Sequence, residues 1–412
     1  MQALIPIDQA EELISPFLPT LGTEEVCLDH AHGRSLCKTI TADRAIPPYD
    51  RVMMDGIAID YGSFVSGRRD FAIAGTQAAG QPPLTLENAD TCIEVMTGAV
   101  LPRGTACVVK IEDIRLENCV AHLSPTCSAQ QGQHIHPLAS DREKGAVLVS
   151  AGSIVTPPVA AIAASVGMTR LSVSRIPSIL LITTGDEVIP AGEAPLPHQI
   201  RRSHCPAIRA SIEPKQLGLI ENMHVPDTRE ALERAVAKGL ENADLILLTG
   251  GISMGKYDYV APVMESLAGE PVFHGVAQRP GKPFAFWSWR RPPVASPSSV
   301  SDASHKDGGV YKPVFALPGN PVSVMACLAR YVIPALRAMR GEDWTPELLP
   351  LAHDTPWNAP FPGLVASHIS KSQLHPAPPR NSGDYTALAS AAGICELATT
   401  STAGTPVPFY PW

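Results

Sequence analysis

Residues 244–258 read D-L-I-L-L-T-G-G-I-S-M-G-K-Y-D, and this stretch decides the fold. Four apolar residues in a row at 245–248 are what a strand buried on both faces of a sheet requires. The glycines and polar residues that follow are typical of a ligand-facing loop at the carboxyl end of such a strand. The segment therefore predicts a parallel sheet that is covered by helices on both faces.

Two other segments repeat this arrangement of an apolar strand and an unusual loop. The run at 178–182 is followed by T-T-G-D-E, and the run at 314–317 is followed by P-G-N-P. Amphipathic or capped patterns predict helices between and after these strands, over 227–240, 259–267 and 321–339. The alternation over about 160 residues predicts a doubly wound α/β domain, which we place at 176–340.

The remainder of the chain has a different rhythm. Short strand-like runs broken by glycine and proline at 57–59, 71–74, 91–96 and 106–111 predict a β-rich domain over 47–142. Helices are expected over 10–18 and 157–165, within a linker domain made of 1–46 and 143–175. Many prolines and few helix signals in 341–412 predict a small terminal β-rich domain, and 291–312 is interpreted as a surface insertion.

Composition excludes several classes of protein. The 412 residues carry a net charge of -8, which gives no general attraction to nucleic acid or to an anionic membrane. The apolar runs at 159–168 and 245–248 are too short to cross a bilayer, and the N-terminus lacks the basic start of a signal peptide. Nine cysteines without any C-x-x-C pair form neither a disulfide framework nor a zinc site. We expect a cytoplasmic protein that binds no nucleic acid and no membrane.

Carboxylates gather in the predicted loops. Glu187 and Asp258 follow neighbouring strands, where they could hold a magnesium ion that also contacts a phosphate. Asp258 could equally cap the next helix, and the position of Asp227 in a D-T-R-E capping box needs no ligand to explain it. The glycine loop after the second strand is neither G-x-G-x-x-G nor a P-loop, so neither nucleotide-binding route is supported.

Two cations lie on a turn that prolines stiffen. The stretch R-P-G-K-P at 279–283 brings Arg279 and Lys282 together before an apolar strand, where they could bind phosphate or another oxyanion. A solvated basic turn explains them as well, and the pair Arg201 and Arg202 is more typical of a solvated face. Asn320 is placed to cap the helix that follows it.

In order along the chain, these stretches resemble the MoeA/gephyrin E-domain family, the molybdopterin molybdenumtransferases. The matching stretches are P-P-Y-D-R-V-M-M-D-G at 47–56, M-T-G-A at 96–99, T-G-D-E at 184–187, T-G-G-I-S-M-G-K-Y-D-Y at 249–259, R-P-G-K-P-F-A-F at 279–286 and L-P-G-N-P-V-S at 317–323. The last four are specific as an ordered set.

The resemblance implies an elongated homodimer with a MoCF-type α/β domain, an inserted β-rich domain and a C-terminal β-barrel. It implies that molybdate is inserted into adenylylated molybdopterin with loss of AMP, with Mg²⁺ as the cofactor. Molybdopterin adenylyltransferase and molybdoenzymes are the further partners that it implies.

The resemblance also implies the site residues. Glu187 and Asp258 become metal ligands. The catalytic set is Asp55, Thr97, Asp141, Glu187, Asp227 and Asp258. The substrate-binding set is Gly250, Gly251, Ser253, Gly255, Arg279, Lys282, Pro318, Gly319, Asn320 and Ser382.

The chain departs from the family pattern in three places. It has Arg202-Ser203-His204 where members have Asp-Ser/Thr-Asn, with Pro214 interrupting the helix that follows, and 137–140 replaces a turn that contains arginine and glycine. In the terminal domain, 381–384 resembles the family's serine loop, but the arginine linked to molybdate has no clear counterpart. These changes leave an alternative function open, a catalytically impaired molybdopterin-binding or scaffold paralogue.

Overall fold

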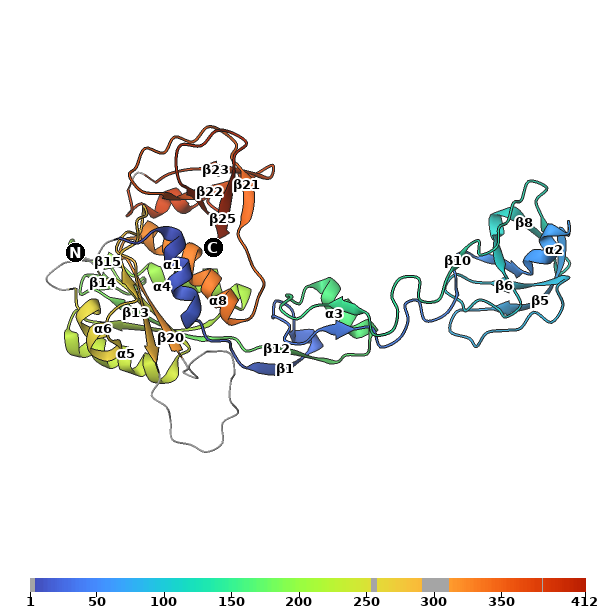
Figure 1. Ribbon diagram of the computed structural model, residues 1–412, viewed down its shortest axis with the longest axis horizontal. Coiled ribbons are helices and arrows are strands. Elements are labelled where there is room, and N and C mark those ends of the chain that lie inside the picture. Colours follow the sequence, from blue (N-terminus) through green and yellow to red (C-terminus); the bar gives the residue numbers. More distant parts are fainter. Residues whose placement is uncertain (1–3, 253–257, 291–310, 380) are drawn as a thin grey trace, which may run out of the picture. The chain divides into compact units, whose positions relative to one another are not determined.

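The structure is a computed structural model and describes residues 4–252, 258–290, 311–379 and 381–412. Many of its elements are labelled in Figure 1. The chain divides into two compact units, of which unit 1 comprises Met1–Lys38, Ala151–Pro157 and Arg170–Trp412. Unit 2 comprises Thr39–Ser150 and Pro158–Thr169.

A six-stranded sheet organises unit 1. Its strand order is β16-β13-β17-β20-β19-β18; the first four strands are parallel, and β19 runs antiparallel to both of its neighbours, β20 and β18. The strands are β13 (Ser178–Thr184), β16 (Leu219–Val225), β17 (Leu245–Thr249), β18 (Phe273–His274), β19 (Ala285–Arg290) and β20 (Tyr311–Leu317). The helices around them are α4 (His204–Ile212), α5 (Arg229–Asn242), α6 (Val260–Ala268), α7 (Pro321–Cys327) and α8 (Ile333–Met339).

Helices cover both faces of this sheet, as the continuous apolar strands predict. Ile179 and Leu181 belong to a core shared with α4, α7 and α8, whereas Leu180 and Ile182 belong to a second core shared with α5 and α6. All four side chains are almost fully buried. Successive residues of one strand therefore supply two cores, and the predicted doubly wound fold is confirmed.

The strand and helix ends differ from expectation at some points. The helix expected over 10–18 is α1 (Ile7–Ile14), which gives way to a 3-10 turn that contains Pro16. Of the insertion expected over 291–312, residues 291–310 lie outside the described residues, and Tyr311 and Lys312 instead begin β20. The helix 157–165 matches α3 (Pro157–Ser165).

The helical segment Pro321–Met339 is long and apolar enough to cross a membrane, which the sequence analysis did not consider. It is 83% buried in the structure, so it is a core helix of the α/β domain. Its middle turn, Leu328–Val332, is a π-helix between α7 and α8. Such turns often mark functional sites.

The π-turn carries a buried arginine that ties three parts of unit 1 together. The side chain of Arg330 is 2% exposed, and its Nε lies 2.9 Å from Oε2 of Glu396 while its Nη1 lies 2.7 Å from Oε2 of Glu11. The guanidinium also lies 4.7 Å from the ring centroid of Tyr410. Glu11 belongs to α1 and Glu396 to the C-terminal sheet, so Arg330 joins both to the α/β domain.

Removing Glu396 should destabilise the protein more than removing Glu11. Glu396 is 17% exposed and Glu11 61%. The Glu396→Ala change removes the less exposed of the two carboxylates that pair with the buried Arg330. We expect the free energy of unfolding to fall by about 3 kcal/mol. Glu11→Ala breaks a solvated pair and should cost at most about 1 kcal/mol. Urea denaturation compares the two variants, and equal losses would contradict this role for Arg330.

The C-terminal sheet of unit 1 closes on itself. Its order is β21-β25-β24-β22-β23, and a bridge between Leu351 and Leu374 joins its two ends. This closure confirms the predicted barrel-like domain. The strands are β21 (Glu347–Pro350), β22 (Gly363–Ser370), β23 (Gln373–Pro376), β24 (Gly393–Leu397) and β25 (Pro406–Pro411). Unit 1 also contains the short pairs β1 (Thr23–Cys27) with β12 (Arg170–Ser174) and β14 (Val188–Ile189) with β15 (Ile200–Arg201).

Unit 2 is the predicted β-rich domain. Its main sheet has the order β7-β4-β6-β5-β9-β8 and buries apolar side chains on both faces. The strands are β4 (Gly56–Ile59), β5 (Asp70–Gln77), β6 (Thr91–Val95), β7 (Cys107–Lys110), β8 (Ile114–Glu117) and β9 (Val120–Leu123). The smaller elements are β2 (Ile40–Thr41), β3 (Arg51–Val52), α2 (Tyr61–Val65), β10 (Ile135–His136), β11 (Val147–Val149) and most of α3.

Candidate functional site

The sheet of unit 1 has a topological switch point at β13. From β13 the chain passes to β16 on one side of that strand, and from β16 it returns to β17 on the other side. In open α/β sheets, ligands bind outside the carboxyl ends of the strands at such a point. The structure has a pocket of about 100 Å³ there, which we call the switch-point pocket. Its lining includes Thr184, Glu187, Arg202, Thr249, Gly250 and Gly319.

The glycine loop after β17 needs glycine for geometric reasons. Gly250 and Gly251 have φ of +88° and +61°, in the left-handed region. A Cβ on Gly250 would lie 3.2 Å from Oγ1 of Thr184, in the neighbouring loop. The two loops can therefore approach each other closely only with glycine here. Ser253 and Gly255, also predicted to bind substrate, lie outside the described residues.

The capping interpretation of Asp227 is wrong. Helix α5 begins at Arg229 with Thr228 as its N-cap and no side-chain capping bond. The carboxylate of Asp227 instead accepts a hydrogen bond of 3.3 Å from the backbone N–H of Asp186, and the Asp227 N–H donates to Oδ1 of Asp186 at 3.1 Å. This reciprocal pair joins the loops that follow β13 and β16. Asp227 also lines a small cavity with Gly251.

Asp258 is not the cap of α6 either. That helix begins at Val260, and Tyr259 is its N-cap. Asp258 is half-buried just before the cap, on the glycine loop that follows β17. Glu187, in contrast, is exposed and lines the switch-point pocket.

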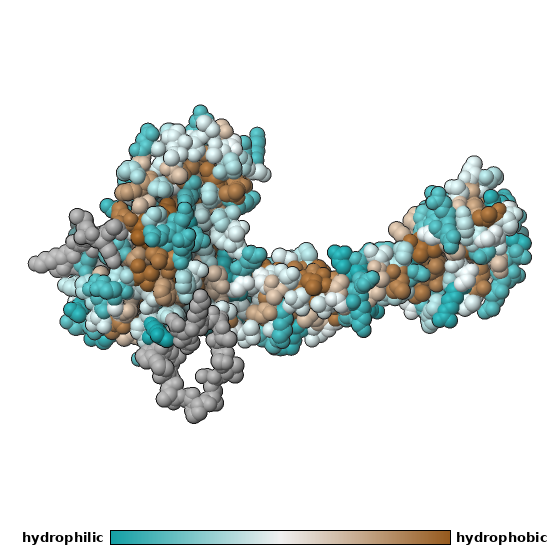
Figure 2. Space-filling view, in the orientation of Figure 1, coloured by the Kyte–Doolittle hydropathy of each residue, from teal (hydrophilic) through white to brown (hydrophobic). Residues whose placement is uncertain are grey.

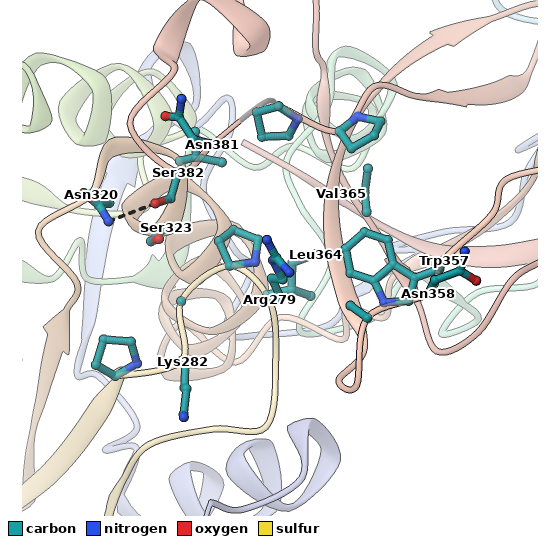
Figure 3. Close-up of a pocket in the computed structure, with 17 residues that line it drawn as sticks. Arg279, Lys282, Asn320, Ser323, Trp357, Asn358, Leu364, Val365, Asn381 and Ser382 are labelled. Carbon is teal, nitrogen blue, oxygen red and sulfur yellow. Dashed lines mark hydrogen bonds between the residues drawn. The ribbon is translucent and has the colours of Figure 1, made fainter.

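A second cavity of about 640 Å³ lies beside the R-P-G-K-P turn, and we call it the large pocket. One wall consists of the turn and the start of α7, and the other comes from the C-terminal domain (Figure 3). The residues used below are Arg279, Lys282, Asn320, Ser323, Trp357 and Ser382. Two cationic side chains and two hydroxyl groups thus line one cavity, and Trp357 forms part of its apolar wall.

Asn320 holds the serine loop of the C-terminal domain. It occupies the N-cap position of α7 but makes no capping bond, so the expected cap is wrong. Its Nδ2 donates instead to Oγ of Ser382 at 2.9 Å, and the N–H of Val322 donates to the Ser382 carbonyl at 3.0 Å. The first of these bonds is drawn in Figure 3. The start of α7 is therefore the point where the serine loop docks.

Buried side chains shape the R-P-G-K-P turn. Gln278 is 1% exposed, donates to the carbonyl of Gly281 at 3.2 Å and accepts a hydrogen bond from the hydroxyl of Tyr331 in the π-turn. The N–H of Arg279 donates to the carbonyl of Pro362 at 2.9 Å, which fixes the turn to the C-terminal domain. Arg279 and Lys282 remain exposed, so the turn presents both charges at the pocket.

Gly281 leaves no room for a side chain. Its φ is +94°, and a Cβ would lie 2.6 Å from both Sγ of Cys327 and Nε2 of Gln278. We expect Gly281→Ala to destabilise the protein by about 2 kcal/mol through strain and overpacking. Gly404→Ala is the matched control, since Gly404 has φ +81° but open space around it. Thermal denaturation measures both variants, and an equal fall in Tm would contradict the overpacking at Gly281.

The two pockets adjoin across a single turn. Gly319 and Pro321 line the switch-point pocket, whereas Asn320 between them lines the large pocket. Pro318 is buried behind the turn and lines neither. Groups bound in the two cavities would therefore be separated by only one stretch of backbone.

Unit 2 contains two clusters of its own predicted residues. Oδ1 of Asp55 accepts hydrogen bonds from the Thr97 N–H at 2.7 Å and from its Oγ1 at 2.8 Å. The backbone bond, and then the hydroxyl bond, hold the pKa of Asp55 below its usual range. Asp55 is therefore ionised at neutral pH.

Asp141 is paired with a histidine that the sequence analysis did not single out. Nε2 of His136 lies 2.8 Å from Oδ1 of Asp141, and Nδ1 of the same ring lies 3.0 Å from Nη2 of Arg51. Because a guanidinium only donates, the contact of Nδ1 with Arg51 requires this nitrogen to accept, which leaves Nε2 to donate to the Asp141 carboxylate. The arrangement orients the Asp141 carboxylate.

Sequence reasoning missed other lining residues. The basic pair in the sequence predicts a solvated face for Arg201 and Arg202, but only Arg201 is exposed, and Arg202 lines the switch-point pocket. Ser323 and Trp357 line the large pocket. Ser323 lies within the quoted L-P-G-N-P-V-S stretch, which was a signal for it, whereas nothing in the sequence around Trp357 marked it.

Comparison with known families places the α/β domain in a molybdopterin-binding class of domain. Residues 180–338 match a family described as probable molybdopterin binding domain, and residues 5–167 match the MoeA N-terminal region (domain I and II). The chain is 33% identical over 417 residues to a molybdopterin molybdenumtransferase of Synechocystis sp., covering 99% of this chain and 100% of that protein. It is 34% identical to one of Synechococcus elongatus, covering 81% and 79%.

Solved structures of similar proteins point to the same family. A molybdopterin biosynthesis MoeA protein from Pyrococcus horikoshii matches with a TM-score of 0.77 and 25% identity over 99% of both chains. The chain belongs to the MoeA family of molybdopterin molybdenumtransferases, which are transferases of molybdenum cofactor biosynthesis.

Proposed function

We propose that this chain inserts molybdate into adenylylated molybdopterin and releases AMP. The observation that carries the proposal is the pair of cavities that adjoin across residues 318–321. One cavity presents two cations and two hydroxyls, and the other lies at the switch point of a molybdopterin-binding type of domain. In this reaction, two Mo–S bonds form to the dithiolene as one oxygen of molybdate leaves with the two thiol protons as water, and water cleaves the phosphoanhydride bond so that AMP departs.

The large pocket would hold the molybdate. Lys282 and Arg279 supply positive charge for a dianion, and the hydroxyls of Ser323 and Ser382 can donate to its oxygens. The chain as a whole carries a charge of -8, so this local charge is what would attract the oxyanion.

The switch-point pocket would hold the phosphate-bearing part of the pterin substrate. Gly250 permits the backbone to approach an anion there, as glycine does in other phosphate-binding loops. With both substrates anionic, the protein must hold them in place against their mutual repulsion. Positioning of this kind can supply much of a rate enhancement.

The described residues fit Mg²⁺ only as an ion that is shared with the substrate. In the described part of the chain, no three His, Cys, Asp or Glu side chains lie in a metal-binding group. Mg²⁺ is commonly bound by one or two carboxylates together with substrate phosphates and water. Glu187 and Asp258, on the loops after β13 and β17, would be those carboxylates. When bound, the ion would neutralise charge on the phosphoanhydride.

The test is release of AMP by the purified protein from adenylylated molybdopterin. We expect release that requires both molybdate and Mg²⁺, and that Asp258→Ala loses. Release no higher than in a protein-free blank would contradict the proposal.

We propose further that the protein works as a cytoplasmic homodimer in which Asp55 and Thr97 complete the site of the partner subunit. Exposed apolar side chains of unit 2 support a docking role for this unit. They include Met53 and Leu138, which are 51% and 53% exposed. Apolar surface of unit 2 is visible in Figure 2.

Mixing two inactive variants tests the shared site. Asp55→Ala and Lys282→Ala alter different units, so a mixed dimer would retain one intact site. After random exchange of subunits we expect about a quarter of the wild-type activity. Dimers that exchange subunits without any recovery would contradict a site built from two chains.

The alternative of an impaired paralogue is tested in cells. Expression in a strain that lacks the transferase should restore the activity of a molybdoenzyme, and failure of a stably expressed chain would favour the alternative. Molybdopterin adenylyltransferase would supply the adenylylated substrate, and molybdoenzymes would receive the product.

A further inference from the structure

Arg202 lies in the switch-point pocket with no protein partner for part of its guanidinium. Its Nε is buried and, among the described residues, has no hydrogen-bond partner. No ion pair joins Arg202 to a carboxylate in that part of the chain either. Buried donors are normally satisfied, so each unpaired donor in a cavity asks for an explanation.

Thr249 gives an independent indication at the same place. It ends β17, is 2% exposed and lines the switch-point pocket. Its Oγ1 is also buried and without a partner among the described residues. Two residues from different elements that line one cavity thus each carry a buried polar atom without a partner among the described residues. A ligand that accepts hydrogen bonds in the cavity would give both atoms a partner after a small turn of each side chain.

The charges around the cavity favour an anion. Burial lowers the pKa of His204, so this ring is neutral at pH 7 and adds no charge. Glu187 is the carboxylate among the lining residues, and by itself it would repel an anion. The permanent charge of Arg202 offsets that repulsion.

The backbone holds Arg202 at the pocket. Its N–H donates to the carbonyl of Ile189 at 2.8 Å, and the N–H of Ile200 donates to the carbonyl of Glu187 at 2.8 Å. Arg202 is therefore attached through β14 and β15 to the loop that carries Glu187. These bonds fix the backbone position from which the side chain lines the pocket.

We propose that Arg202 and Thr249 bind a phosphate group of the substrate in the switch-point pocket. The volume of about 100 Å³ is the space of about three water molecules, and a phosphate group needs similar room. The inference rests on the proposed function for the identity of the substrate. Phosphate binding by Arg202 itself follows from the pocket alone.

Inorganic pyrophosphate is the probe, with affinity measured by isothermal titration calorimetry. We expect Arg202→Gln to weaken binding by about tenfold to a hundredfold, as for a lost charge-assisted bond. Arg202→Lys should retain part of the affinity, and Thr249→Val should lose less than Arg202→Gln. Arg201→Gln is the matched control, because the neighbouring Arg201 is exposed and donates to the Glu193 carbonyl. Unchanged binding in Arg202→Gln, or an equal loss in Arg201→Gln, would overturn the proposal.

Kinetics with adenylylated molybdopterin separate this inference from the proposed function. A phosphate contact present in both ground and transition states should raise KM in Arg202→Gln and leave kcat nearly unchanged. Wild-type protein that releases AMP alongside an Arg202→Gln variant with normal KM would overturn the inference alone. Wild-type protein that binds pyrophosphate through Arg202 but releases no AMP would overturn the proposed function alone.

Discussion

Lys282→Ala is expected to lower molybdate-dependent release of AMP by about a hundredfold or more. The loss of one preorganised donor to a developing or bound oxyanion has an effect of this size in other enzymes. Lys282 is exposed on a turn fixed by the buried Gln278, so alanine removes the charge without disturbing the support of the turn. The assay is initial rate of AMP release over a range of molybdate concentrations.

The control for this prediction is Lys371→Ala. Lys371 is an exposed lysine of the C-terminal domain, between β22 and β23, and it does not line the large pocket. The control should retain wild-type rates. If Lys282→Ala keeps the wild-type dependence on molybdate, the oxyanion does not bind at the R-P-G-K-P turn.

Glu187→Gln is expected to disrupt the use of magnesium. The substitution keeps the size of the side chain but removes a charged oxygen ligand, which hard cations prefer. We expect the Mg²⁺ concentration for half-maximal activity to rise by about tenfold to a hundredfold. A magnesium titration of the activity measures it directly.

Glu193→Gln is the matched control for Glu187. Glu193 is exposed on the same β14–β15 segment but does not line the switch-point pocket. Its substitution should leave the magnesium titration unchanged. A Glu187→Gln variant with the wild-type titration would remove this carboxylate from the proposed metal site.

The central sheet was predictable because its pattern is local. The apolar runs that correspond to β13, β17 and β20 are followed directly by their loops. Because these strands are buried on both faces, they appear in the sequence as continuous apolar runs. Strand β16 was missed, since Glu221, Asn222 and His224 interrupt its apolar residues at the edge of the sheet.

The roles of several polar residues could not be read from local spacing. Asp227 and Asn320 both occupy sequence positions typical of helix caps, yet their side chains bond across the fold to Asp186 and Ser382. The second of these bonds spans 62 residues of sequence. A cap pattern records only what a residue can do locally, whereas tertiary partners decide which bond forms.

The place of Arg202 in the pocket could not be read from the local sequence either. A basic pair in sequence is usually solvated, and the sequence does not tell which member turns inward. In the structure, short pairing of β14 with β15 exposes Arg201 and places Arg202 in the pocket. The large pocket was equally hidden, because one wall comes from a domain that follows the α/β domain in sequence.

The most direct test of the two-pocket account is to locate molybdenum in crystals grown with molybdate, by anomalous diffraction on both sides of its absorption edge. The account predicts a molybdenum peak in the large pocket, within hydrogen-bonding distance of Lys282 and of Ser323 or Ser382. A peak confined to another part of the protein, or an empty large pocket at saturating molybdate, would contradict it.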